Sequence, residues 1–117
     1  MIFMARPSIQ DSVYVTNKLR DKMLMVHCRS KDDDLGAHGL AVGESFEWSF
    51  DPSWLGETLF WCSLAVEDKC LSFVAYYEGD MYTEYWYVHD DGVYGQTRHA
   101  NATFYEAPWR RVSPRQY

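Results

Sequence analysis

The sequence predicts an all-β fold: a sandwich of two antiparallel sheets with about seven to eight strands, immunoglobulin-like in architecture. Short runs of alternating apolar and polar residues recur about every 8 to 12 positions, with turn residues between them. Aromatic residues make up 17% of the chain, and their flat rings pack well on pleated strands. No window of a dozen residues keeps apolar positions at helical spacing with plausible caps, so no helix is predicted.

The first two strands are expected at residues 12–17 and 22–30. In the first, Val13 and Val15 should point inward, because successive strand residues face opposite sides. In the second, alternate residues from Leu24 onward share one face. Both faces of this second run are fairly apolar, which is typical of a central strand. A polar turn joins the two strands.

The middle of the chain provides three further strands. Residues 31–43 are assigned no strand, because a charged loop is followed by a stretch that glycines punctuate. The cleanest period-two alternation follows at residues 44–50. The longest apolar run, at residues 58–66, predicts a buried core strand. Residues 71–77 predict the next strand, after a charged break.

A hairpin is the clearest feature of the C-terminal part. Apolar runs at residues 85–89 and from Val93 onward are joined by Asp90-Asp91-Gly92. Asp-Gly between two such runs is a strong hairpin signal, because the turn needs the positive φ that glycine adopts. A last strand is expected near residues 102–105, and the prolines beyond it favour an edge or coil.

One domain is expected, with a flexible segment over residues 1–11, the sandwich over residues 12–106 and a C-terminal tail over residues 107–117. The chain has 117 residues, which suffices for one core but not for a deep pocket. Its N-terminal segment is too short for a signal peptide, so either a signal has been removed or the protein is not secreted. The sequence contains no run of about 18 apolar residues, so no membrane insertion is expected.

Charge and composition argue against nucleic acid and metal. The net charge is −6, and phosphates would be repelled. Three cysteines allow at most one internal disulfide, and no Cys-x-x-Cys motif indicates zinc. His27 and Cys28 should face opposite sides of a strand, so they cannot share a ligand site. The acidic run at residues 32–34 lacks the spacing of a calcium-binding EF-hand. No metal or cofactor is therefore expected.

Four segments, taken in order, carry a family resemblance. The first is Leu-Met-Val-His-Cys-Arg-Ser-Lys-Asp-Asp-Asp-Leu-Gly at residues 24–36, where a strand ending in His-Cys leads into a Lys/Asp-rich loop. Phe-Glu-Trp-Ser-Phe follows at residues 46–50, Thr-Leu-Phe-Trp-Cys at 58–62 and Trp-Tyr-Val-His-Asp-Asp-Gly-Val-Tyr at 86–94. In these segments the chain resembles the plant self-incompatibility S-protein homologue family.

The resemblance implies a small secreted plant protein with a β-sandwich fold and no catalytic activity. Founding members of the family are pistil-side ligands in poppy that trigger calcium entry into incompatible pollen. The first two cysteine positions of the family correspond to Cys28 and Cys62, which we predict to be bonded to each other. Two later family cysteines are absent here, and Cys70 matches no family position.

The function expected from this resemblance is that of a monomeric, secreted protein ligand for a cell-surface receptor. Charged loops at the end of a rigid sandwich commonly carry binding specificity. Two turns of this chain combine local charge with turn geometry. The predicted receptor-binding residues are Lys31, Asp32, Asp33, Asp34, Leu35, Asp90, Asp91 and Gly92.

Two other non-catalytic functions stay open. A secreted carbohydrate-binding sandwich would need an exposed aromatic shelf, for which the best candidates are Trp54 with Tyr76, Tyr77 or Tyr82. An inert structural or storage protein would show neither a charged loop face nor an aromatic patch.

The sequence gives no sign of an enzyme. Gly-x-Ser-x-Gly, P-loop and His-Glu-x-x-His motifs do not occur in it. A nucleophile–base pair of Cys62 and His89 would have nothing to orient its base. The tripeptide Asn101-Ala-Thr103 fits the N-glycosylation sequon and predicts a glycan on Asn101 on the secretory route.

Overall fold

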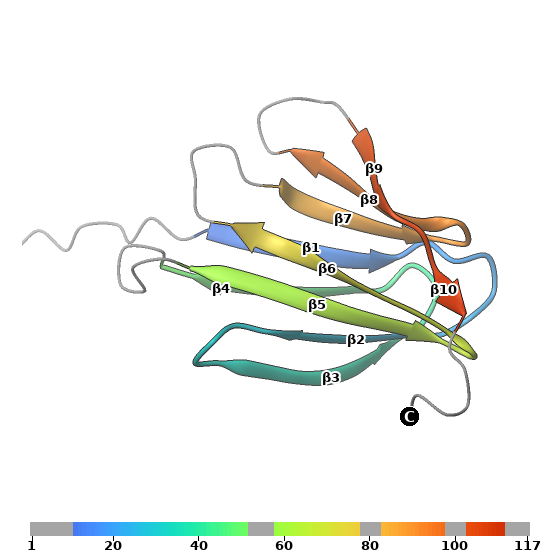
Figure 1. The fold of residues 1–117 in the computed structure, drawn as a ribbon, viewed down its shortest axis with the longest axis horizontal. Coiled ribbons are helices and arrows are strands. Elements are labelled where there is room, and N and C mark those ends of the chain that lie inside the picture. The colour runs from blue at the N-terminus through green and yellow to red at the C-terminus, as the bar shows by residue number, and fades with distance from the viewer. Residues whose placement is uncertain (1–10, 52–57, 78–82, 98–102, 112–117) are drawn as a thin grey trace, which may run out of the picture.

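Ten strands make up the described part of the protein (Figure 1). The computed structural model describes residues 11–51, 58–77, 83–97 and 103–111. The strands are β1 (Asp11–Asn17), β2 (Leu24–Arg29), β3 (Asp34–Leu40), β4 (Ser45–Phe50), β5 (Leu59–Val66), β6 (Lys69–Tyr77), β7 (Thr83–His89), β8 (Gly92–Thr97), β9 (Thr103–Ala107) and β10 (Arg110–Arg111).

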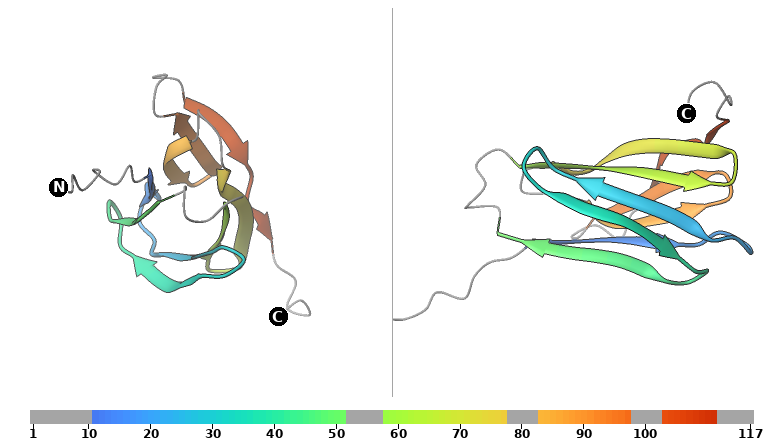
Figure 2. Two further views of the ribbon diagram at one scale, coloured as in Figure 1. Left: turned by 90° about the vertical axis from the view of Figure 1, so that its left-hand side faces the viewer. Right: turned by 90° about the horizontal axis from the view of Figure 1, so that it is seen from below.

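The strands form two five-stranded sheets that pack face to face, as Figure 2 shows from two sides. The first sheet has the order β4-β1-β7-β8-β9 and the second β10-β6-β5-β2-β3. The predicted all-β sandwich is confirmed, with more strands than expected. One pairing departs from the antiparallel prediction: β1 and β7 are parallel, with Tyr14 opposite Tyr85. A parallel pair needs a long connection between its strands, and β2 to β6 supply it here.

Side chains from alternate strand positions point inward and fill the space between the sheets. In β1 every second residue is buried, and Val13 and Val15 are fully so, as predicted. The alternation arises because neighbouring strand residues point to opposite faces. Burying one large apolar side chain contributes about 1.5–3 kcal/mol to folding. The core cluster comprises Val13, Val15, Leu19, Leu24, Val26, Cys28, Leu40, Trp48, Phe50, Phe60, Cys62, Leu64, Val66, Leu71, Phe73, Ala75, Tyr76, Trp86, Val88 and Val93.

Strand β3 is absent from the sequence-based prediction. It is an edge strand that pairs with β2 alone. Its sequence, Asp-Leu-Gly-Ala-His-Gly-Leu, contains two glycines, which weaken any strand signal. The φ of Gly36 is 83°, a conformation that residues with side chains rarely adopt. Pairing with β2, rather than local propensity, therefore accounts for this strand.

The chain crosses from one sheet to the other near residue 108. β9 pairs with β8 in the first sheet, and β10 then pairs with β6 in the second, with Arg110 opposite Cys70. Between them, Trp109 packs against the core and donates a hydrogen bond from Nε1 to the carbonyl of His89 at 2.8 Å. The segment expected as a tail from residue 107 thus contains the end of β9 and all of β10.

Candidate functional site

Residues 30–33 connect β2 to β3 at one end of the sandwich, which we call the loop end (Figure 1). Backbone and side chain close this loop. The Ser30 N–H donates to the Asp33 carbonyl at 2.7 Å, and the Asp33 N–H donates to Ser30 Oγ at 3.1 Å. Lys31, Asp32 and Asp33 are exposed. A tight turn held by its own hydrogen bonds therefore displays three charged side chains.

Asp34 and Leu35 hold the base of the loop. Asp34 Oδ1 accepts a hydrogen bond from the Gly36 N–H at 2.8 Å and lies 2.6 Å from His27 Nε2. The hydrogen bond from Gly36, followed by that from His27, lowers the pKa of Asp34. Leu35 is partly buried and packs against the core. Of the five predicted loop residues, these two therefore anchor the loop.

An exposed patch lies beside this loop, on the outer face of the second sheet. Trp61 is opposite Arg29 on one side and Val74 on the other, and the guanidinium carbon of Arg29 lies 5.9 Å from the Trp61 ring centroid. Leu59 and Tyr77 are opposite each other further along β5 and β6. Val74 is 45% and Tyr77 70% exposed. We call these five residues the loop-end patch.

Sequence alone does not single out the loop-end patch, because the apolar run at residues 58–66 predicts a buried core strand. The structure buries only alternate residues of β5, with Phe60 and Cys62 inside and Leu59 and Trp61 outside. A continuous apolar run hides this alternation. Only the assembled sheet shows which strands lie beside β5 and that the outer face of β5 is uncovered.

The hairpin tip lies at the other end of the sandwich, the hairpin end (Figure 1). Asp90 and Asp91 form a two-residue turn between β7 and β8. Gly92 is buried with a φ of 145°, and a Cβ there would lie 2.3 Å from the carbonyl oxygen of Ala107. The two predicted parts of the receptor site are thus separated by the length of a strand, about 20 Å for six residues. One compact interface does not include both.

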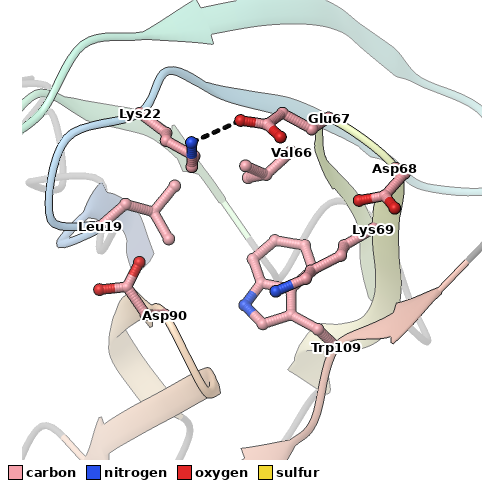
Figure 3. Close-up of a pocket in the computed structure, with 8 residues that line it drawn as sticks. All are labelled: Leu19, Lys22, Val66, Glu67, Asp68, Lys69, Asp90 and Trp109. Atoms are coloured by element: carbon pink, nitrogen blue, oxygen red, sulfur yellow. Dashed lines mark ion pairs between the residues drawn. The ribbon is translucent and has the colours of Figure 1, made fainter.

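A shallow pocket opens at the hairpin end (Figure 3). Lys22 forms an ion pair with Glu67 at its rim, and the hydrogen bond that Lys22 donates to the Glu67 carboxylate raises the pKa of Lys22. The pocket has a volume of ≈ 80 Å³, whereas small-molecule sites commonly measure about 300–1,000 Å³. It has room for a few water molecules or a small side chain. The lining residues are Leu19, Lys22, Val66, Glu67, Asp68, Lys69, Asp90 and Trp109.

The sandwich also matches a known family. The family model for "Plant self-incompatibility protein S1" matches residues 12–109. This chain belongs to the S1 self-incompatibility family. S-protein homolog 29 from Arabidopsis thaliana is 38% identical to it over 90 residues, which cover 73% of this chain and 67% of that protein. S-protein homolog 21 from the same plant is 30% identical over 113 residues, which cover 86% of this chain and 83% of that protein.

A solved structure shares the fold of this S1-family protein. It aligns with a TM-score of 0.65 at 16% identity, over 91% of this chain and 99% of the other. The solved proteins are described as self-incompatibility protein homologues, a widespread family of small, highly stable, secreted proteins from plants. The family and the β-sandwich fold predicted from the sequence are therefore confirmed.

The S1-family chain joins two of its three cysteines in the core. Cys28 and Cys62 are opposite each other in β2 and β5, their Cα atoms lie 4.0 Å apart, and a disulfide bonds them. Cys70 carries a partly exposed free thiol. The nucleophile–base pair of Cys62 and His89 is excluded, because the bonded Cys62 has no thiol to activate.

The sequence also yields predictions about metal binding, membrane insertion and glycosylation. Within the described ranges, no three His, Cys, Asp or Glu side chains gather into a group that could hold a metal ion. Cys28 points into the core and His27 to the outer face of β2, as predicted. No helix in the same ranges is long and apolar enough to cross a membrane. The sequon at Asn101 lies outside the described residues.

The aromatic shelf expected for a sugar binder does not form around Tyr76. This side chain is 2% exposed, and its hydroxyl donates to the buried carboxylate of Asp11 at 2.7 Å. The expectation was therefore wrong for Tyr76. Tyr77 is exposed and belongs to the loop-end patch. Trp54 and Tyr82 lie outside the described residues.

Proposed function

We propose that this protein is a secreted ligand that binds a cell-surface receptor through its loop end. The secretion of the solved relatives supports the first part of the proposal. The composition of the loop-end patch supports the second, because interface hot spots are enriched in tryptophan, tyrosine and arginine. All three residue types occur together in this patch.

The observation that carries the proposal is the continuity of the loop-end patch with the charged loop at residues 30–33. Exposed apolar side chains rimmed by polar ones mark interaction surfaces. The apolar centre would supply the free energy of desolvation, and the charges of the loop would favour one orientation of the partner. Arg29 already contacts Trp61 in the free protein, and a contact formed before binding reduces the entropy lost on binding.

A receptor contact at the hairpin tip stays a separate prediction. Asp90 and Asp91 are exposed, whereas Gly92 is buried and shapes the turn. A receptor that contacts both ends of the sandwich would have to span the length of its strands. Alanine at Asp90 therefore tests the tip independently of the loop end.

The receptor proposal is tested by saturable binding of the labelled protein to plant protoplasts. We expect Trp61→Ala to weaken binding about thirtyfold or more, since a hot-spot residue contributes about 2 kcal/mol or more. Val74→Ala should weaken it by a smaller factor. Val42→Ala is the matched control, because Val42 is a similarly exposed valine (50%) in the turn between β3 and β4.

Binding that unlabelled protein fails to displace would contradict the proposal, as would binding that Trp61→Ala leaves unchanged. Secretion is tested separately by intact mass and thiol alkylation of protein from plant apoplast, purified without reductant. One disulfide, one free thiol and a glycan on Asn101 would support the secretory route. Three free thiols and no glycan would contradict it.

A further inference from the structure

A second surface, of different chemistry, covers the outer face of the first sheet. Tyr14, Tyr85, Tyr87 and Tyr94 all neighbour buried residues in their strands and therefore point outward. Tyr105 in β9 is opposite Tyr94 and is 49% exposed. We call these five residues the tyrosine face.

The tyrosine face is continuous across four strands. Ring centroids are 5.1 Å apart between Tyr14 and Tyr85 and 6.5 Å apart between Tyr85 and Tyr87. Tyr87 is opposite Tyr94 in the hairpin of β7 and β8. The rings of Tyr94 and Tyr105 are again 5.1 Å apart. A partner would therefore meet one aromatic surface rather than isolated rings.

Charge is distributed unequally between the two sheets. The strands of the first sheet contain acidic residues and no lysine or arginine. The acidic residues are Asp11, Glu47, Glu84 and Glu106. In the strands of the second sheet, basic residues outnumber the one acidic residue, Asp34. The basic residues are Arg29, Lys69, Arg110 and Arg111.

Carboxylates lie close to the rings of the tyrosine face. The charge of Glu84 raises the pKa of Tyr85. Asp91 accepts a hydrogen bond from the Tyr94 hydroxyl at 2.7 Å, which raises the pKa of Tyr94. Glu47 is exposed beside these rings, on β4. Three carboxylates, those of Glu47, Glu84 and Asp91, therefore border this face, and its five strands contain no lysine or arginine.

We propose that the tyrosine face binds a lysine- or arginine-rich segment of a partner protein. Aromatic rings attract cations through the negative charge above their faces. The surrounding carboxylates add attraction, speed association and repel an anionic partner. Tyrosine also supplies rigid contact area that loses little conformational entropy on binding.

This inference does not rest on the receptor role. The loop-end patch lies on the outer face of the second sheet, and the tyrosine face lies on the outer face of the first. The core separates the two surfaces. A failure of either proposal therefore leaves the other standing, and the two are tested with different variants.

The test is direct binding of a fluorescent nine-residue oligo-arginine peptide, measured by anisotropy on the folded full chain. A Gly-Ser peptide of the same length and cellohexaose serve as neutral comparators. We expect oligo-arginine to bind with an affinity that falls severalfold as ionic strength rises, because salt screens exposed charges. Neither neutral compound should compete with it.

Variants distinguish this face from the net charge of the protein. Glu47→Gln with Glu84→Gln is expected to lower the affinity for oligo-arginine about tenfold. Asp32→Asn with Asp33→Asn changes the net charge equally but acts at the loop end, so a loss below about twofold is expected. Tyr85→Ala should lower the affinity about fivefold, and Tyr85→Phe should preserve it because the ring remains.

Three outcomes would overturn the proposal. Equal losses for the two double variants would show that the peptide responds to net charge alone. Unchanged binding by a folded Tyr85→Ala variant would remove the aromatic contribution. Tighter, salt-independent binding of cellohexaose would show that the face serves a neutral glycan instead. If Tyr85→Ala does not fold, the carboxylate variants and Tyr85→Phe decide the matter.

Discussion

Gly95 and Gly39 show how the atoms nearest to a glycine decide whether it can be replaced by alanine. At Gly95, in β8, a Cβ would lie 2.5 Å from the Phe104 ring and 2.8 Å from the Trp86 ring. At Gly39, in β3, the nearest atom is the terminal methyl of Met23 at 3.2 Å. Neither glycine has a positive φ, so the two positions differ mainly in space. The Trp86 ring is buried in the core and cannot move aside as the end of a methionine can.

Gly95→Ala is therefore expected to lower the free energy of unfolding by about 1–3 kcal/mol, the usual cost of overpacking. Gly39→Ala, its matched control, should change it by about 0.5 kcal/mol or less. Urea denaturation of both variants measures the difference. Equal effects would contradict the close approach of Phe104 and Trp86 to β8.

Asp34 gives a residue-scale prediction for pH. Its pKa is lower in the folded protein than the ordinary aspartate value of about 3.9, so the unfolded chain binds the proton more readily. The resulting stability is present above the unfolded pKa and is lost as pH falls through the folded one. Between pH 5 and about pH 3, the urea midpoint of the wild type should fall more than that of Asp34→Asn. Parallel curves would show that Asp34 contributes nothing to acid sensitivity.

At the scale of elements, strand pairing decides on which side of a sheet each residue lies. A bulge shifts the register between β5 and β6, so that Phe60 is opposite Tyr76 while Trp61 is opposite Val74. Such a bulge places an extra residue in one strand. Ala75 and Tyr76 are consequently both buried. The failed expectation for Tyr76 as part of an exposed shelf follows from this single irregularity.

The disulfide between β2 and β5 gives the element-scale prediction. It closes a sequence separation of 34 between Cys28 and Cys62. Replacing both cysteines with alanine should lower the free energy of unfolding by about 2–5 kcal/mol, because the unfolded chain regains the freedom of that loop. Cys70→Ser, at the free cysteine, is the control and should change it by about 1 kcal/mol or less.

Thiol alkylation checks the bond independently of stability. Protein that has been unfolded without reductant should present one reactive thiol, that of Cys70. Three reactive thiols would contradict both the disulfide and the stability loss expected from its removal. An unreduced double variant should also present one thiol.

At the scale of the whole molecule, the sandwich presents two outer faces of different composition. The loop-end patch is apolar with an arginine, and basic residues predominate in the strands of its sheet. The tyrosine face is aromatic and bordered by carboxylates. The packed core between them keeps the two surfaces apart. A protein of this size can therefore present two independent binding surfaces without a deep cavity.

Because the surfaces are separate, their variants should have separable effects. Trp61→Ala is expected to weaken protoplast binding and to leave oligo-arginine binding within about twofold of wild type, since distant sites act independently. Glu47→Gln with Glu84→Gln should do the reverse. Both measurements on the same protein preparations provide the comparison. Loss of both activities in both variants would contradict the two-surface arrangement.

Much of the fold is determined by local sequence. The alternation at residues 44–50 predicts β4, and Asp90-Asp91-Gly92 predicts the hairpin of β7 and β8, as the structure has them. The charged loop after residue 30 is also found where it was expected. Side-chain alternation and turn chemistry act over a few residues, so they can be recognised without knowledge of the neighbouring strands.

The strand pairings, the bulge and the placement of the surface residues were decided only by the tertiary structure. The parallel pairing of β1 with β7 brings Tyr14 beside Tyr85, and the bulge in β5 and β6 turns Tyr76 inward. The same arrangement opens the outer face of β5 and sends the two charged turns to opposite ends. Each outcome depends on strands far apart in the chain. Their register is set by packing across the whole sandwich, because a shift of one residue would exchange the faces of a strand.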